Sequence, residues 1–348
     1  MTFGEDGLHG GGERYAVELA RALSRRVPTR LVSFADRPRK ESVGGLEIHL
    51  HKPLRHLHGN RLNPLSFGFL SSLADVEVVH CASWNVLVTD LAVLAARLRR
   101  QRVFVTDVGG GGAFTLHRYL HIANWVDRFL LIAPQGGTEF LEHRDRWSIL
   151  LAGIDTDRYR PLPRAERRGV LFVGRLLPHK GINYLIEAVS PTTPLTIAGR
   201  PYDPEYFALL RRLAEGKDVT FYTEATDDDI LRLYQTSAVS VLPSVCRTIY
   251  GHEFPLPELL GFAAMEAMSC ATPVLITKVG ALTELFSDGE CGFHVPPNDP
   301  AALRRNLDLL LGDPDLAARL GARGRERILE TFTWDHVAER CLAAYAAD

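Results

Sequence analysis

The chain alternates between short apolar runs and longer stretches in which apolar residues recur every three or four positions. The first pattern is typical of buried strands and the second of amphipathic helices. Residues 88–100 (VTDLAVLAARLRR) show the helical pattern. Apolar runs of strand length surround them at residues 29–35, 46–51, 76–83 and 102–108. Because strands and helices alternate, the first half predicts an α/β fold with a parallel sheet wrapped by helices.

The second half repeats this alternation. Residues 206–216 predict a helix, and residues 313–348 predict two amphipathic helices broken at 332–334. The predicted strands here include residues 170–173, 194–200 and 239–244. Before them, the pattern predicts a helix over residues 122–130 and a short strand over residues 130–134.

The length and one polar stretch predict two domains. A chain of 348 residues is long enough for two domains that each bury a core. Pro161 and Pro163 precede a charged run at residues 164–168, which is typical of an interdomain linker. We therefore expect domains at residues 1–163 and 169–330.

Charge and cysteine content narrow the partners and the compartment. Lys and Arg number 40 against 42 Asp and Glu, and this balance argues against a nucleic-acid binder with a basic surface. The five cysteines include no C-x-x-C pair, so neither a zinc site nor a disulfide framework is predicted. No apolar run reaches about 18 residues and no signal peptide is evident. We expect a cytoplasmic protein with a small-molecule partner.

The histidines do not predict a metal site. His49 and His51 fall on one face of a strand, and no carboxylate or thiol completes a spaced set. His117 and His121 are four positions apart but lack the glutamate of H-E-x-x-H. We expect these two on the surface of a helix, and we expect no metal.

Two carboxylates, Glu258 and Glu266, lie eight positions apart. If Gly261 opens a helix, Glu258 precedes its N-terminus and Glu266 lies roughly 7–8 Å further along the helix than Gly261. The backbone N–H groups of Gly261, Phe262 and Ala263 would then face an anion. One helix could hold hydroxyl groups at both ends and a phosphate between them. The alternative is a buried amphipathic helix with two solvated glutamates.

Two basic residues bracket another loop. Gly174 to His179 follows the strand at 170–173, and a helix is expected to open near Lys180 or Gly181. Arg175 and Lys180 would then converge with free N–H groups where a diphosphate could bind. A surface loop with two solvated cations is the alternative.

Glycine loops mark two more candidate sites. Gly10, Gly11 and Gly12 precede an amphipathic helix, and Gly109 to Gly112 follow the strand at 102–108. Glycines let N–H groups approach a phosphate. The alternative is a flexible turn for the first loop, which the residues by themselves favour, and a mobile connector for the second. Only Met1 to Phe3 remain for a strand before the first loop, so we expect about ten to fifteen further residues of β character upstream.

Several stretches resemble glycosyltransferase family 4, whose members have the GT-B fold. The resemblance is carried by the E-x7-E segment from Glu258, the GRLLPHKG stretch from Gly174, the GGxE loop from Gly10 and the GIDTDRYRP segment. It implies two Rossmann-like domains facing a central cleft, with a final helix, residues 331–348, that crosses back to the first domain. It also implies transfer of a sugar from a nucleotide diphosphate sugar, with retention at the anomeric carbon, and no cofactor.

The resemblance assigns roles to the candidate residues. It places Glu258 at the transferred sugar, Glu266 at the ribose, and Arg175 and Lys180 at the diphosphate. The remaining donor-side candidates are Gly10, Gly11, Gly12, Gly199, Gly261, Phe262 and Ala263. The acceptor is left open as a sugar, a lipid or a small molecule. The apolar run 62–73 also leaves open a peripheral position at the inner face of the membrane, or an ordinary core segment.

Some positions depart from the family pattern. Val108 stands where the family has a histidine, and neighbouring Asp107 could supply the polar group instead. Ala271 and Ala281 replace glycines. The Asp155-Thr156-Asp157 segment matches the family's linker-side motif rather than a metal-binding D-x-D, so transfer is expected to need no metal. The alternatives are a binding protein without transfer activity, or a phosphorylase or epimerase of the same fold.

Overall fold

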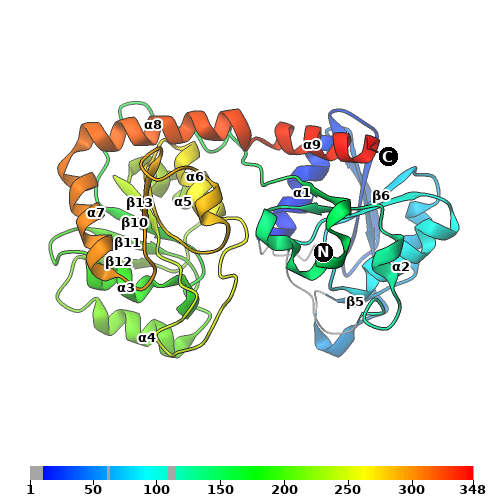
Figure 1. Cartoon of the computed structure of the whole chain (residues 1–348), viewed down its shortest axis with the longest axis horizontal. Coiled ribbons are helices and arrows are strands. Elements are labelled where there is room, and N and C mark those ends of the chain that lie inside the picture. The colour runs from blue at the N-terminus through cyan, green and yellow to red at the C-terminus, as the bar shows by residue number, and fades with distance from the viewer. Residues whose placement is uncertain (1–10, 61–62, 109–114, 348) are drawn as a thin grey trace. The chain divides into compact units, whose positions relative to one another are not determined.

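A computed structural model describes residues 11–60, 63–108 and 115–347 (Figure 1). The chain divides into two compact units. One extends to Gly153 and includes the last segment from Trp334, and the other runs from Ile154 to Thr333.

The unit from Ile154 to Thr333 is built on one parallel sheet, in the order β12-β11-β10-β13-β14-β15. In register, Val170 lies between Leu195 and Val239. The strands are β10 (Val170–Val173), β11 (Leu195–Ala198), β12 (Val219–Tyr222), β13 (Val239–Leu242), β14 (Val274–Thr277) and β15 (Gly292–Val295). The short apolar runs of the sequence become central strands because both faces of the sheet are covered.

Helices cover both faces of this sheet (Figure 1). On one side α3 packs against α4 and α7, and on the other α6 packs against α5 and α8. The helices are α3 (Ile182–Ala188), α4 (Pro204–Leu213), α5 (Asp227–Thr236), α6 (Phe262–Ser269), α7 (Pro300–Gly312) and α8 (Pro314–Thr331), with 3-10 turns η5 (Pro178–Lys180) and η6 (Gly280–Glu284). Thr226 and Asp229 form a capping box at the start of α5, which fixes where that helix begins.

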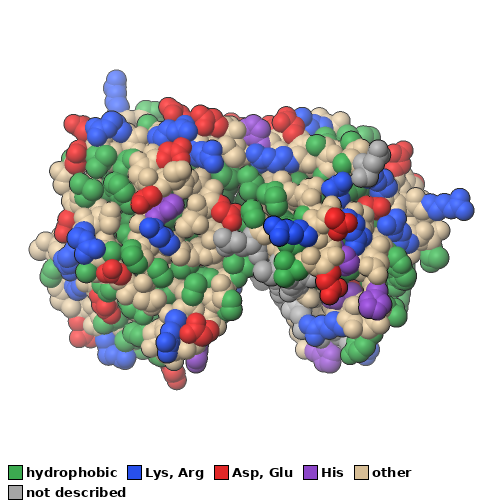
Figure 2. All heavy atoms as spheres, in the orientation of Figure 1, with side chains coloured by type: hydrophobic (Ala, Val, Ile, Leu, Met, Phe, Trp, Pro, Cys, Tyr) green, Lys and Arg blue, Asp and Glu red, His purple; other side chains and the backbone are tan. Residues whose placement is uncertain are grey.

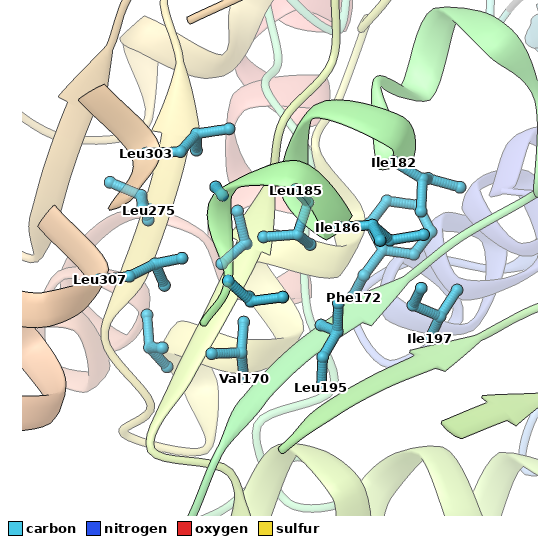
Figure 3. Packing of buried hydrophobic residues seen from close by; sticks show 14 of the residues in the cluster. Val170, Phe172, Ile182, Leu185, Ile186, Leu195, Ile197, Leu275, Leu303 and Leu307 are labelled. Atoms are coloured by element: carbon cyan, nitrogen blue, oxygen red, sulfur yellow. The ribbon is translucent and has the colours of Figure 1, made fainter. Parts of the chain in front are cut away.

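The core beneath α3 and α7 is built mainly from apolar side chains (Figure 3). Phe172 and Ile197 from the sheet pack with Leu185 of α3 and with Leu303 and Leu307 of α7. Each of these side chains is at most 2% exposed. This packing anchors β10 and α3, which border the Arg175 and Lys180 loop.

The described residues of the other unit form three sheets. In the first, β1 pairs in parallel with β3, and β2 pairs with β3 in the antiparallel sense. The second is the antiparallel pair β4-β5, and the third is parallel, in the order β6-β7-β8-β9. The strands are β1 (Thr29–Phe34), β2 (Arg39–Val43), β3 (Leu46–His51), β4 (Arg55–His56), β5 (Pro64–Leu65), β6 (Val78–Cys81), β7 (Arg102–Val105), β8 (Arg128–Leu131) and β9 (Trp147–Ile149). The strand expected at Met1 to Phe3 lies outside the described residues.

Helix α1 packs against the C-terminal helix α9 in this unit. Tyr15 of α1 meets Trp334 edge to face at 5.2 Å, and the ring of His80 lies 5.8 Å from that of Tyr345. The helices are α1 (Gly11–Ser24), α2 (Leu87–Leu98) and α9 (Trp334–Ala346), and the 3-10 segments are η1 (Leu57–Gly59), η2 (Gly68–Leu73), η3 (Ile122–Trp125) and η4 (Pro134–Arg146). The predicted break at 332–334 is confirmed, because α8 ends at Thr331 and α9 begins at Trp334.

Two local expectations differ from the structure. Residues 122–130 were expected to be helical, but they form the short turn η3 and then strand β8. Phe129 and Leu130 are fully buried, and the apolar spacing of a buried strand resembles that of a buried helix. Strand β2 had no apolar signature, because all five of its residues are exposed. It is held by pairing with β3 rather than by burial.

The surface carries mixed charge. On the face drawn in Figure 2, Lys and Arg side chains are interspersed with Asp and Glu side chains. Within the described residues, no helix is both long enough and apolar enough to span a bilayer.

Candidate functional site

An ion pair joins the two strongest motifs of the sequence. Lys180 Nζ lies 2.5 Å from Glu258 Oε1, and the two side chains are 15% and 9% exposed. Lys180 ends the 3-10 turn η5, and Gly181, with φ of 64°, then starts α3. A Cβ at Gly181 would overlap the carbonyl of Pro243, so the absence of a side chain lets this loop approach the end of β13. Glu258 follows the same strand at the end of a loop.

A buried hydroxyl meets the same carboxylate. Ser244 Oγ, just beyond β13, donates a hydrogen bond of 2.5 Å to Glu258 Oε1, the oxygen that also accepts from Lys180. For Glu258 Oε2, no donor is found in the part of the chain that the structure describes. One oxygen is therefore held by the protein, and the other can accept a hydrogen bond from a hydroxyl group of a ligand.

The predicted opening of α6 is confirmed. Gly261 precedes Phe262–Ser269 and has φ of 64°, a conformation that favours glycine. The first N–H groups of the helix, including those of Phe262 and Ala263, have no carbonyl partners within α6, and this end of a helix attracts anions. The reading of two solvated glutamates is wrong, because Glu258 and Glu266 are each only 8% exposed.

Glu266 is held from a neighbouring helix. Tyr234 of α5 is fully buried, and its hydroxyl donates a hydrogen bond of 2.9 Å to Glu266 Oε2. Burial, together with the negative charge of Glu266, raises the pKa of Tyr234 well above its ordinary value. The phenol therefore remains a protonated donor to the carboxylate.

The other two donor-side candidates border the same loop. Arg175 is exposed, and no carboxylate among the described residues pairs with its guanidinium group. A Cβ at Gly199, whose φ is 152°, would overlap the carbonyl of Gly174. Close backbone packing between the ends of β10 and β11 thus explains why position 199 is a glycine, and no ligand is needed to account for it.

His179 belongs to the site, although the sequence did not single it out. Its ring stacks on Phe254 with centroids 4.8 Å apart. Burial, reinforced by the positive charge of Lys180, lowers the pKa of His179 to about 4. At neutral pH the ring is uncharged and adds no repulsion to the two cations beside it. The sequence feature that could have indicated His179 was its position next to Lys180 in the GRLLPHKG loop.

In the other unit, the candidates Gly12 and Asp107 lie near each other, because Gly12 is close to Val108, the residue after Asp107. A Cβ at Gly12 would lie 3.0 Å from Val108 Cγ2, so the residue that replaces the family histidine packs on the start of α1. Asp107 Oδ1 accepts a long hydrogen bond of 3.3 Å from the backbone N–H of Trp84. Gly11 begins α1, whereas Gly10 and Gly109 to Gly112 lie outside the described residues.

The histidines expected on the surface of a helix are arranged differently. His117 lies in a turn, stacks on Trp84 at 4.3 Å, and bonds to Asp90 Oδ1 at 2.9 Å. The expectation was wrong for His117, which lies in a turn and is held by Asp90 of α2. His121 is exposed, but it precedes the 3-10 turn η3 and does not lie in a helix. Within the described ranges no group of three or more His, Cys, Asp or Glu could hold a metal ion.

The apolar run at residues 62–73 is partly core. Phe69 and Leu73 are 4% and 7% exposed and pack in the core of their unit, with Phe69 edge to face on Phe34. Phe67 is 54% exposed. The core reading therefore holds for the η2 part of this run.

Protein-family models match the chain to the same family that its motifs resemble. The family described as Glycosyl transferases group 1 matches residues 154–327, half of the chain, and the one described as Glycosyltransferase Family 4 matches residues 9–158. The chain belongs to glycosyltransferase family 4. The first match contains the Lys180, Glu258 and Glu266 site, and the second contains Gly12 and Asp107.

Curated relatives of this family 4 chain differ in name. Over 230 residues it is 32% identical to the alpha-maltose-1-phosphate synthase of Mycolicibacterium smegmatis, covering 58% of this chain and 57% of that protein. It is 33% identical over 227 residues to the D-inositol 3-phosphate glycosyltransferase of Acidothermus cellulolyticus, covering 58% and 48%. The chain thus spans about half the length of these relatives.

Solved structures share the GT-B fold. HepE of Anabaena, in complex with UDP, superposes with a TM-score of 0.74 at 18% identity, covering 99% of this chain and 98% of HepE. Sucrose-phosphate synthase of Thermosynechococcus elongatus gives 0.69 at 22% identity, covering 99% and 94%. At these identities the likeness establishes the fold of the family 4 chain.

Proposed function

We propose that this family 4 chain is a retaining glycosyltransferase that moves a sugar from a nucleotide diphosphate sugar to an acceptor without a divalent metal. The observation that carries the proposal is the 2.5 Å ion pair between Lys180 and Glu258, in which Glu258 lies just before α6. It brings together a cation suited to a diphosphate and a carboxylate suited to sugar hydroxyls.

Cleavage of the anomeric bond builds negative charge on the leaving diphosphate. Preorganised donors and cations are the usual means of stabilising such charge. Lys180 and Arg175 supply two cations, and the start of α6 supplies backbone N–H groups. Because Lys180 is bound to Glu258, a bound diphosphate would compete for, or share, its ammonium group.

The second glutamate suits the other end of the donor. Glu266 lies in α6, five positions beyond Gly261, and a carboxylate readily accepts hydrogen bonds from the two hydroxyls of a ribose. HepE, which shares the fold, was solved with UDP and with UDP-glucose, which supports a nucleotide-sugar donor for this chain. Asp107 in the other unit is proposed as a polar group near the transferred sugar.

The donor is identified with a panel of UDP, GDP and ADP sugars. A donor at 100 times its Kd adds about 2.7 kcal/mol of apparent stability, so thermal shift reveals which base binds. The same donors are then incubated with the protein, and nucleotide release is measured with and without sugar, lipid and small-molecule acceptors. We expect release of the nucleoside diphosphate and a product with the anomeric configuration of the donor, read by NMR.

Other outcomes would identify other reactions. Binding without release in any arm would indicate a nucleotide-sugar-binding protein. Turnover that requires phosphate would indicate a phosphorylase, and an epimerised donor would indicate an epimerase. An inverted product would overturn retention.

A further inference from the structure

We propose that two buried hydroxyl groups, those of Ser244 and Tyr234, are positioning residues that orient Glu258 and Glu266 for the two ends of the donor. The inference rests on the proposed function and adds two residues to its site. Neither residue belongs to the sequence motifs that pointed to the glutamates. Each donates to one carboxylate oxygen from a different element of the unit.

Ser244 holds Glu258 from the end of β13. Its hydroxyl and the ammonium group of Lys180 both donate to Oε1, each at 2.5 Å. A carboxylate with two donors on one oxygen is restrained in rotation, so Oε2 keeps a fixed direction. Ser244 is itself held in place, because it is fully buried and its carbonyl accepts a 2.6 Å hydrogen bond from Thr277 Oγ1.

Tyr234 holds Glu266 in a similar way. Its hydroxyl donates to Oε2 at 2.9 Å. The backbone of Tyr234 is fixed by Thr272 Oγ1, which donates to its carbonyl at 2.5 Å, and the ring meets Tyr159 edge to face at 6.2 Å. Removal of the phenolic oxygen alone therefore leaves the ring and the backbone supported.

The two hydroxyls should affect different kinetic constants. Ser244 acts through the carboxylate at the sugar, where charge changes in the transition state, so its loss should lower kcat. Tyr234 acts through the carboxylate at the ribose, which contributes to ground-state binding, so its loss should weaken nucleotide affinity. A purely structural role would not produce this division.

For Ser244 the chain offers a matched control. Ser240 lies in β13, the strand that Ser244 follows, is also fully buried, and its hydroxyl has no hydrogen-bond partner among the described residues. Ser244→Ala should lower kcat by about ten-fold to a hundred-fold, the range for a hydrogen bond to a charged group, with nucleotide Kd changed less than two-fold. Ser240→Ala should leave both constants within two-fold of the unmodified protein.

A double variant tests whether Ser244 acts on kcat through Glu258. In Glu258→Ala protein, the further change Ser244→Ala should alter kcat less than two-fold, because no carboxylate remains to be oriented. If Ser244→Ala fails to fold, Ser244→Cys fills the same space with a weaker donor and should show the same loss. Equal kcat for Ser244→Ala and Ser240→Ala, or losses that multiply with Glu258→Ala, would overturn the role of Ser244.

For Tyr234 the control is Tyr206, a second fully buried tyrosine, whose hydroxyl bonds to Asn183 Oδ1 at 2.9 Å instead of a glutamate. Titration calorimetry with UDP, GDP and ADP and with their 2′-deoxy forms measures the preference for ribose. Tyr234→Phe should weaken the ribonucleotide about ten-fold and narrow its preference over the deoxy form. Tyr206→Phe should leave that preference unchanged.

The measurements distinguish a failure of the positioning roles from a failure of the proposed function. If the unmodified protein turns over a nucleotide sugar but Tyr234→Phe keeps the full ribose preference, the positioning role of Tyr234 is wrong and the proposed function stands. If the unmodified protein neither binds nor turns over any donor of the panel, the proposed function fails and the positioning roles fail with it.

Discussion

Lys180 and Glu258, 78 positions apart in the sequence, form an ion pair of 2.5 Å that is largely withdrawn from solvent. A buried pair holds both charges in place, and removal of either partner leaves a costly unpaired charge. The cation expected at the donor diphosphate is thus positioned by the carboxylate expected at the sugar. We therefore expect these two groups to act as one site.

Loss of either cation should slow transfer. Arg175→Ala and Lys180→Ala are each expected to lower kcat/KM by about 10²-fold to 10³-fold or more, because each removes a preorganised stabiliser of the leaving diphosphate. Steady-state rates with the active donor measure this, and circular dichroism checks the fold. Arg211→Ala, which removes an exposed arginine of α4, is the control and should change the rate less than two-fold. An active Lys180→Ala enzyme would contradict the role given to Lys180.

The two glutamates should behave differently when neutralised. Glu266→Gln is expected to weaken donor binding more than Glu258→Gln, and Glu258→Gln is expected to act mainly on turnover, because only Glu258 meets charge that changes during the reaction. Calorimetry with the bare nucleotide and steady-state kinetics separate the effects. Equal loss of nucleotide affinity in both variants would refute the assignment.

Transfer should continue in chelator. With Arg175, Lys180 and the start of α6 at the diphosphate, we expect full activity after dialysis against EDTA and no gain on adding Mg²⁺ or Mn²⁺. The measurement is nucleotide release before and after chelation. Activity that disappears in EDTA and returns with either metal would show that the metal-free mechanism is wrong.

Ala271 adopts a backbone conformation that suits glycine. Its φ is 55°, and it directly follows Cys270, the C-cap of α6, where helices commonly end on glycine. Ala271→Gly should therefore stabilise the fold by about 0.5–1 kcal/mol, the left-handed penalty less the entropy that glycine loses. Urea denaturation measures the change. Ala267→Gly within α6 is the control and should destabilise by about 1 kcal/mol or more.

His80 should make the protein less stable in acid. Burial lowers the pKa of His80 to about 4, below its ordinary value of 6.5. The unfolded chain then binds the proton more readily, so the free energy of unfolding should fall as pH drops from about 6.5 to about 4, by about 3 kcal/mol from this group. His179, whose pKa is also lowered to about 4, adds a loss of the same sign.

Denaturation curves at pH 7 and pH 5 test this dependence. His80→Gln should reduce the difference in stability between the two pH values, whatever its effect at pH 7. His121→Gln, at an exposed position, should leave the difference unchanged. A pH dependence that is the same in His80→Gln and in the unmodified protein would exclude His80 as its source.

The sequence by itself determined the local elements that carry the site. Apolar runs predicted β10, β11 and β13, and the glycines at 181 and 261 marked the starts of α3 and α6, because each needs a positive φ that other residues adopt at a cost. The motif spacing was also sufficient to indicate Lys180, Glu258 and Glu266. These features depend on neighbours within a few positions, which a linear pattern records.

Only the tertiary structure decided how those residues are held. Ser244 reaches Glu258 because β13 ends beside the Lys180 loop, and Tyr234 reaches Glu266 because α5 packs on α6. Strand β2 and the turn at His117 escaped the pattern for the same reason, since a distant partner stabilises each of them. Contacts between segments far apart in the chain depend on packing geometry, and periodicity within a segment carries no information about its distant neighbours.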